Sequence, residues 1–138
     1  MQLLDRHGRD GEVIARRFGA AHLRLPAVVP DSPLQSVPVL RLPRWQERAL
    51  WWPGQRALVV AEALGSAPYF ALGAPVGVHP MLRLRPPGAL RPFEPEHVLF
   101  GHGAGVHGPG AAPAVRRAYA RSVRDLPRLL TQLPALVR

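Results

Sequence analysis

The sequence contains no cysteine, which excludes disulfides and metal sites built on thiolates. It also contains no lysine, so arginine supplies all 18 basic residues behind the net charge of +9. Together with the absence of asparagine and a single isoleucine, this bias is typical of a GC-rich genome rather than of selection for an anionic ligand. Because the arginines are scattered along the chain, we interpret them as a solvated surface and favour this over nucleic-acid binding.

Long apolar runs are missing as well. No uninterrupted apolar segment approaches the roughly 20 residues that cross a membrane. The first residues, Met1 to His7, lack the basic segment followed by an apolar stretch that marks a signal peptide. We therefore expect a cytoplasmic protein without a membrane partner. The length of 138 residues and the hydrophobic fraction of 47% suit one folded domain, residues 1–138.

The periodicity of apolar residues predicts an α/β layered arrangement. Residues 10–18 and 112–133 have helical spacing, and Pro127 predicts a kink or restart in the second helix. Pro53-Gly54 predicts a turn, and the apolar run 57–61 predicts a strand buried on both faces. Short apolar runs predict strands at residues 21–25, 37–42, 48–52, 56–61 and 97–100.

Several polar residues stand where predicted elements begin or end, or in the weakly patterned middle of the chain. They are His7, Asp10, Glu62, Tyr69, His79 and His102. Imidazoles and carboxylates at strand ends can meet at one rim of a sheet, and such nitrogen and oxygen donors suit a divalent cation. Each residue also has an ordinary interpretation, since Glu62 could cap a helix and His102, between two glycines, could simply be exposed.

One formal motif is set aside. Residues 103–108 spell G-x-G-x-x-G after a predicted strand, as in dinucleotide-binding sites. Such a site also needs a second strand with an acidic residue about 20 residues further on, and the sequence has no such strand. We interpret the segment as a glycine-rich loop that positions His102.

The order of these pieces resembles the second half of the metallo-β-lactamase fold. That family has a His-x-His-x-Asp-His loop before a helix, later a strand ending in Gly-Asp, and then a strand leading into a Gly-His or Ser-His turn. Residues 48–65 resemble the hairpin before the family's bridging aspartate, and residues 95–103, Pro-Glu-His-Val-Leu-Phe-Gly-His-Gly, resemble its last-histidine turn. The resemblance spans essentially the whole chain. It implies half of an αββα sandwich, a mixed sheet covered by helices.

The resemblance also implies that the metal-binding signature is eroded. Asp5, His7, Arg9 and Asp10 fall on the positions of the signature's His, His, Asp and His, so only His7 is retained. No histidine stands near residues 43–47, where the family has its next ligand. Later in the chain, Glu62 replaces the bridging aspartate and His102 is retained.

What remains implies at most one zinc or other divalent metal, held by His7, Glu62 and His102, with Asp10 as a ligand or catalytic base. Arg9 adds a positive charge that opposes metal binding, and its guanidinium could instead pair with Glu62 or Asp10.

Two functions stay open at this point. One is a metallo-β-lactamase-fold hydrolase relative whose metal-dependent hydrolysis is impaired or absent. The other is a non-catalytic binding or assembly module of the same fold. A third function, binding of nucleic acid through arginines, is less favoured than either. Because half a sandwich leaves one sheet face uncovered, we expect self-association through that face.

Overall fold

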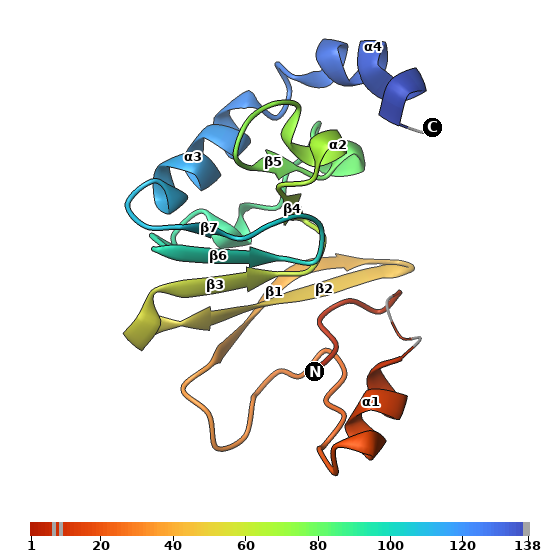
Figure 1. Ribbon diagram of the computed structural model, residues 1–138, viewed down its shortest axis with the longest axis vertical. Helices are drawn as coiled ribbons and strands as arrows, with labels where there is room; N and C mark the ends of the chain where they lie inside the picture. Colours follow the sequence, from red (N-terminus) through yellow and green to blue (C-terminus); the bar gives the residue numbers. More distant parts are fainter. Residues whose placement is uncertain (7, 9, 137–138) are drawn as a thin grey trace.

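A five-stranded mixed sheet lies at the centre of the chain (Figure 1). The computed structural model describes residues 1–6, 8 and 10–136, and of residues 132–136 we describe the backbone only. The sheet has the order β1-β2-β3-β6-β7. Its strands are β1 (Gln35–Leu42), β2 (Trp45–Trp52), β3 (Ala57–Val60), β6 (His97–Phe100) and β7 (Val106–His107).

The strand pairing confirms most of the predicted strands. The first three strands are antiparallel neighbours, β3 and β6 are parallel, and β6 and β7 are antiparallel. The 3₁₀ turn η1 (Pro53–Gln55) joins β2 to β3 where Pro53-Gly54 predicted a turn. The strand predicted at residues 21–25 is wrong, because this segment makes only an isolated bridge between Arg24 and Gln2. Leu25 has a φ of +44°, which ends the extended backbone there.

The two faces of the sheet are not equally buried, so the prediction that residues 57–61 are buried on both faces is wrong. Leu58, Val60 and Val98 are all 0% exposed and pack in the main core. Val59 points to the opposite face, opposite Leu50 on one side and Leu99 on the other. Leu99 is 43% exposed, so this second face remains partly open.

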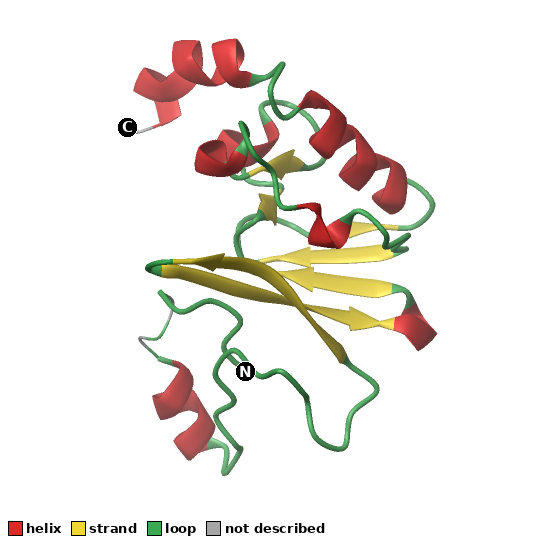
Figure 2. Cartoon of the chain, turned by 180° about the vertical axis from the view of Figure 1, so that it is seen from behind, coloured by secondary structure: helices red, strands yellow, loops and turns green. Residues whose placement is uncertain are grey.

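Helices lie on both sides of the sheet (Figure 2). The helices α2 (Pro68–Ala71), α3 (Ala111–Arg121) and α4 (Leu126–Leu136) are on one side, and α1 (Gly11–Arg17) is on the other. The break between α3 and α4 confirms the restart that Pro127 predicted. Pro127 is the second residue of α4, where its missing N–H leaves no helical hydrogen bond unmade.

The weakly patterned middle of the chain forms a second, smaller layer above the sheet. Its strands β4 (Leu64–Gly65) and β5 (Gly77–Val78) pair with each other, and the 3₁₀ turns η2 (Pro80–Leu82) and η3 (Gly88–Leu90) follow. Arg83, 1% exposed, fixes this layer by donating to the Phe70 carbonyl and pairing with Asp125 between α3 and α4.

The fold is thus mixed α/β, as predicted. Within the described residues, no helix is both long and apolar enough to cross a membrane.

Candidate functional site

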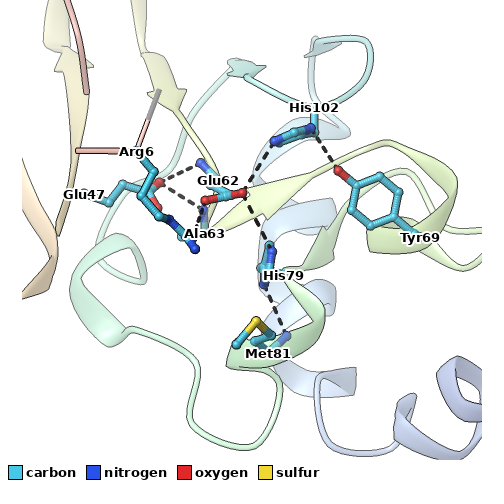
Figure 3. Close-up of polar contacts among 8 residues, drawn as sticks. All are labelled: Arg6, Glu47, Glu62, Ala63, Tyr69, His79, Met81 and His102. Carbon is cyan, nitrogen blue, oxygen red and sulfur yellow. Dashed lines mark hydrogen bonds and ion pairs between the residues drawn. The ribbon is translucent and has the colours of Figure 1, made fainter. Parts of the chain in front are cut away.

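Glu62 lies two residues after the end of β3, at the carboxyl end of the parallel pair β3–β6 (Figure 3). Because the strands are parallel, the residues that follow β3 and β6 emerge at the same edge of the sheet. The structure therefore brings Glu62 and His102 together, whereas their assignment as metal ligands stays a prediction. The Glu62 Oε1 atom lies 3.7 Å from His102 Nε2 and 3.9 Å from His79 Nε2.

A buried carboxylate holds the backbone of Glu62 in place. Glu47 on β2 is 1% exposed, and its Oε1 atom accepts hydrogen bonds from the N–H groups of Glu62 (2.8 Å) and Ala63 (2.9 Å). Burial raises the pKa of Glu47 above its usual range, and these two hydrogen bonds oppose the shift. Glu47 also lies beside Leu4 through an isolated bridge, so one residue links the turn of Glu62 to the N-terminal segment.

Two glycines bring the backbone of His102 against the turn that follows Glu62. A Cβ atom at Gly101 would lie 2.3 Å from the Ala61 carbonyl oxygen, and Gly103 has a φ of +99°. The close approach lets the His102 carbonyl accept from the N–H groups of Ser66 and Ala67. The interpretation of His102 as a simply exposed residue between glycines is therefore wrong.

The imidazole of His102 is oriented by an aromatic pair on α2. The Tyr69 hydroxyl lies 2.9 Å from His102 Nδ1, and the Phe70 ring stacks on the imidazole with 5.3 Å between centroids. Burial, and secondly the negative charge of Glu62, raise the pKa of Tyr69, so its hydroxyl keeps its proton at neutral pH. These contacts turn the Nε2 side of His102 toward Glu62 (Figure 3).

The orientation of the His79 ring is fixed by a backbone N–H two residues further along the chain. The N–H of Met81 donates to His79 Nδ1 at 3.2 Å, which makes His79 the cap of η2. Burial lowers the pKa of His79, so the ring is neutral at neutral pH, and the Glu62 charge opposes the shift. A neutral imidazole that accepts at Nδ1 carries its proton on Nε2. The Nε2–H of His79 therefore lies on the side of the ring that faces the Glu62 carboxylate, at 3.9 Å and beyond hydrogen-bond distance.

Arg6 supplies the one full positive charge seen on this carboxylate in the described residues. Its guanidinium Nη2 atom donates to Glu62 Oε2 at 2.8 Å. The guanidinium also lies over the Trp45 ring, 4.2 Å from the centroid, and Trp45 packs edge-on against His79. Stacking and ion pairing together hold the guanidinium beside Glu62.

These contacts do not suit a metal ion. A zinc-bound histidine donates its second ring N–H to an acceptor, whereas His79 Nδ1 already accepts from Met81. The Arg6 guanidinium already neutralises the carboxylate that would bind the cation. In the part of the chain that the structure describes, no group of three or more His, Asp or Glu residues is arranged to hold a metal.

The remaining predicted site residues lie apart or outside the described residues. His7, predicted as a ligand, and Arg9, predicted to oppose the metal or pair with Glu62, are both outside them. Asp10 precedes α1 and is exposed, and no hydrogen bond or ion pair between described residues joins it to Glu62. Among the described residues, Glu62 forms an ion pair with Arg6, and the pairing predicted for Arg9 stays a prediction.

The sequence argument gave no role to Glu47 or Arg6. Glu47 could have been noticed, because it is the one polar residue in the inward-facing phase Trp45, Glu47, Ala49 of β2. A carboxylate in that phase predicts a buried group with a structural partner. Arg6 had no such signal among 18 arginines.

No protein-family model, no curated protein and no solved structure matches this chain. The functional assignment therefore depends on the geometry of the site and on the sequence resemblance.

Proposed function

We propose that this chain is a relative of the metallo-β-lactamase-fold hydrolases in which metal-dependent hydrolysis has been lost. The fold we propose is half of an αββα sandwich, a finer assignment than the mixed α/β sheet that the structure shows. The meeting of Glu62 and His102 at the ends of two parallel neighbours supports this assignment, since these two positions were taken from the family's metal ligands.

The main support for the proposed loss of metal-dependent hydrolysis is the 2.8 Å ion pair between Arg6 and Glu62. A metal activates water by lowering its pKa and by polarising the scissile group. Here the carboxylate that would hold the metal is neutralised by a guanidinium and flanked by two imidazoles. The arginine stabilises the fold of this edge in the place where the family has a cation.

Hydrolysis assays test the proposal. With and without zinc, we expect no turnover above buffer of a chromogenic β-lactam, a p-nitrophenyl ester or bis(p-nitrophenyl) phosphate. Zinc-dependent turnover that disappears in His102→Ala would show that the site is an active metal centre and would overturn the proposal.

The alternative function, a binding or assembly module, is favoured by one observation. The open face of the sheet holds an apolar groove of 460 Å³. The described residues that line it include no arginine and no carboxylate, although the chain carries a net charge of +9. The lining residues are Leu34, Leu50, Trp52, Gln55, Ala57, Val59, His97, Leu99 and His107.

We expect a second copy of the chain to cover this groove, because two such uncharged faces can meet without placing like charges together. Light scattering should therefore show dimers or larger oligomers that dissociate in Leu99→Asp. The control Leu84→Asp replaces a leucine that is 76% exposed outside the groove and should leave the mass unchanged. A monodisperse monomer for the natural sequence would contradict this expectation.

A further inference from the structure

His97 and His107 form a pair of imidazoles on the open face of the sheet, away from Glu62. They are direct partners across the antiparallel strands β6 and β7. Their Nδ1 atoms lie 3.1 Å apart, with ring centroids at 5.3 Å and an interplanar angle of 50°. Two nitrogens at this distance share one hydrogen, so one of them presents a lone pair rather than a proton.

The backbone holds the two histidines beside each other. The strands hold the two residues in register. Next to the pair, the Gly108 N–H donates to the Glu96 carbonyl at a distance of 2.7 Å. Gly105 leaves the space that the His107 ring occupies, because a Cβ atom there would lie 2.7 Å from His107 Nε2. Both imidazoles are therefore placed before any ligand arrives, which reduces the entropy cost of binding.

The surroundings of the pair also suit a cation. In a single copy of the chain, His97 is half-buried and His107 is exposed at the end of the apolar groove, so water and ions reach the pair before a second copy covers the groove. Arginine is absent from the described residues that line this groove, although the chain contains 18 arginines in 138 residues. A cation at the pair therefore meets no guanidinium among the groove residues.

The distance between the nitrogens matches two neighbouring positions on a transition-metal ion. With metal–nitrogen bonds of about 2.0 Å, nitrogens 3.1 Å apart subtend about 100° at the metal. This angle lies between the about 90° of a tetragonal site and the about 109° of a tetrahedral site, so the spacing suits a transition metal in either geometry. Cu²⁺ also has the highest affinity for imidazole among the divalent first-row metals.

We propose that His97 and His107 form a two-histidine site for a divalent transition metal, with Cu²⁺ bound most tightly and water completing the coordination. Binding through both Nδ1 atoms requires the ring that carries its proton on Nδ1 to move it to Nε2 or to solvent. Metal and proton thus compete for the same lone pairs. This inference is independent of the proposed loss of the Glu62 site.

Calorimetric titration of the full chain with Cu²⁺, together with electron paramagnetic resonance, tests the proposal. We expect one Cu²⁺ per chain with nitrogen coordination, and at least a tenfold loss of affinity in His107→Gln and in His97→Gln. Gly105→Ala, which crowds the His107 ring without removing a ligand, should also weaken binding. The matched controls His22→Gln and His102→Gln remove imidazoles elsewhere and should bind like the natural sequence.

Two results would overturn the proposal. One is the absence of stoichiometric Cu²⁺ binding to the natural sequence. The other is binding that survives His97→Gln and His107→Gln or is lost in His102→Gln. Circular dichroism of each variant verifies that the fold is retained, and Gly105→Ala remains informative even if one histidine variant unfolds.

Discussion

Leu58→Asp is expected to abolish cooperative unfolding of the domain. Leu58 is 0% exposed at the centre of the sheet, on the face that packs in the main core. An aspartate there is an unpaired buried charge, and its cost of several kcal/mol is comparable to the stability of a small domain, about 5–15 kcal/mol. Thermal and urea unfolding followed by circular dichroism measure the effect.

The neighbouring residue provides the matched control. Val59→Asp makes the same change one position along the same strand, but on the half-open face opposite Leu50 and Leu99. We expect this variant to lose only about 1–2 kcal/mol, because its carboxylate reaches water and the loss is mainly one of strand propensity and local packing. Equal losses in the two variants would show that the assignment of the buried face is wrong.

The second large effect is expected for Glu47→Ala. This change leaves the N–H groups of Glu62 and Ala63 without their acceptor, and an unsatisfied buried donor costs about 1–3 kcal/mol. We therefore expect a loss of about 3 kcal/mol or more in the free energy of unfolding. We also expect the Glu62 turn to lose its shape, which hydrogen exchange of the Glu62 and Ala63 amides reports.

Glu47→Gln separates the hydrogen bonds from the charge. Its side-chain oxygen can still accept both N–H groups, so we expect a loss of at most about 1 kcal/mol. The folded state raises the pKa of Glu47 above the ordinary value of 4.5, so the natural chain loses stability as the pH rises from that value through the folded pKa. Glu47→Gln does not lose stability in this way. Its free energy of unfolding, relative to that of the natural chain, should therefore be higher at pH 7 than at pH 4.

If Glu47→Gln destabilised the chain as much as Glu47→Ala at both pH values, the role assigned to the Glu47 oxygen would be wrong. Urea unfolding at pH 4 and pH 7 gives both comparisons.

The sequence allowed the strands around β3 and β6 to be predicted, because each is a short apolar run with clear turn residues at its ends. It also placed Glu62 and His102 at strand ends, and the parallel pairing of β3 with β6 brings them together. Parallel neighbours separated by some 36 residues cannot be read from local periodicity, so the sequence placed both residues at strand ends without giving the parallel pairing that joins them.

The parts that were not predicted depend on long-range contacts. The strand assigned to residues 21–25 had the right alternation, but it finds only Gln2 as a pairing partner. The burial of β3 on one face could not be seen from its continuous apolar run of alanine, leucine and valine, which is compatible with either arrangement. Arg6 acquires its role only through Glu62, which is 56 residues away.

The central claim is that the Arg6 guanidinium takes the place of a metal ion beside Glu62, and a calorimetric titration with zinc tests it most directly. The titration is done in the His107→Gln background, so that the histidine pair on the open face contributes nothing. The account predicts no tight stoichiometric binding while Arg6 is present, and binding that appears or strengthens at least tenfold in Arg6→Ala. Tight stoichiometric zinc binding with Arg6 in place, abolished by His102→Ala, would contradict the account and restore a metal centre at this site.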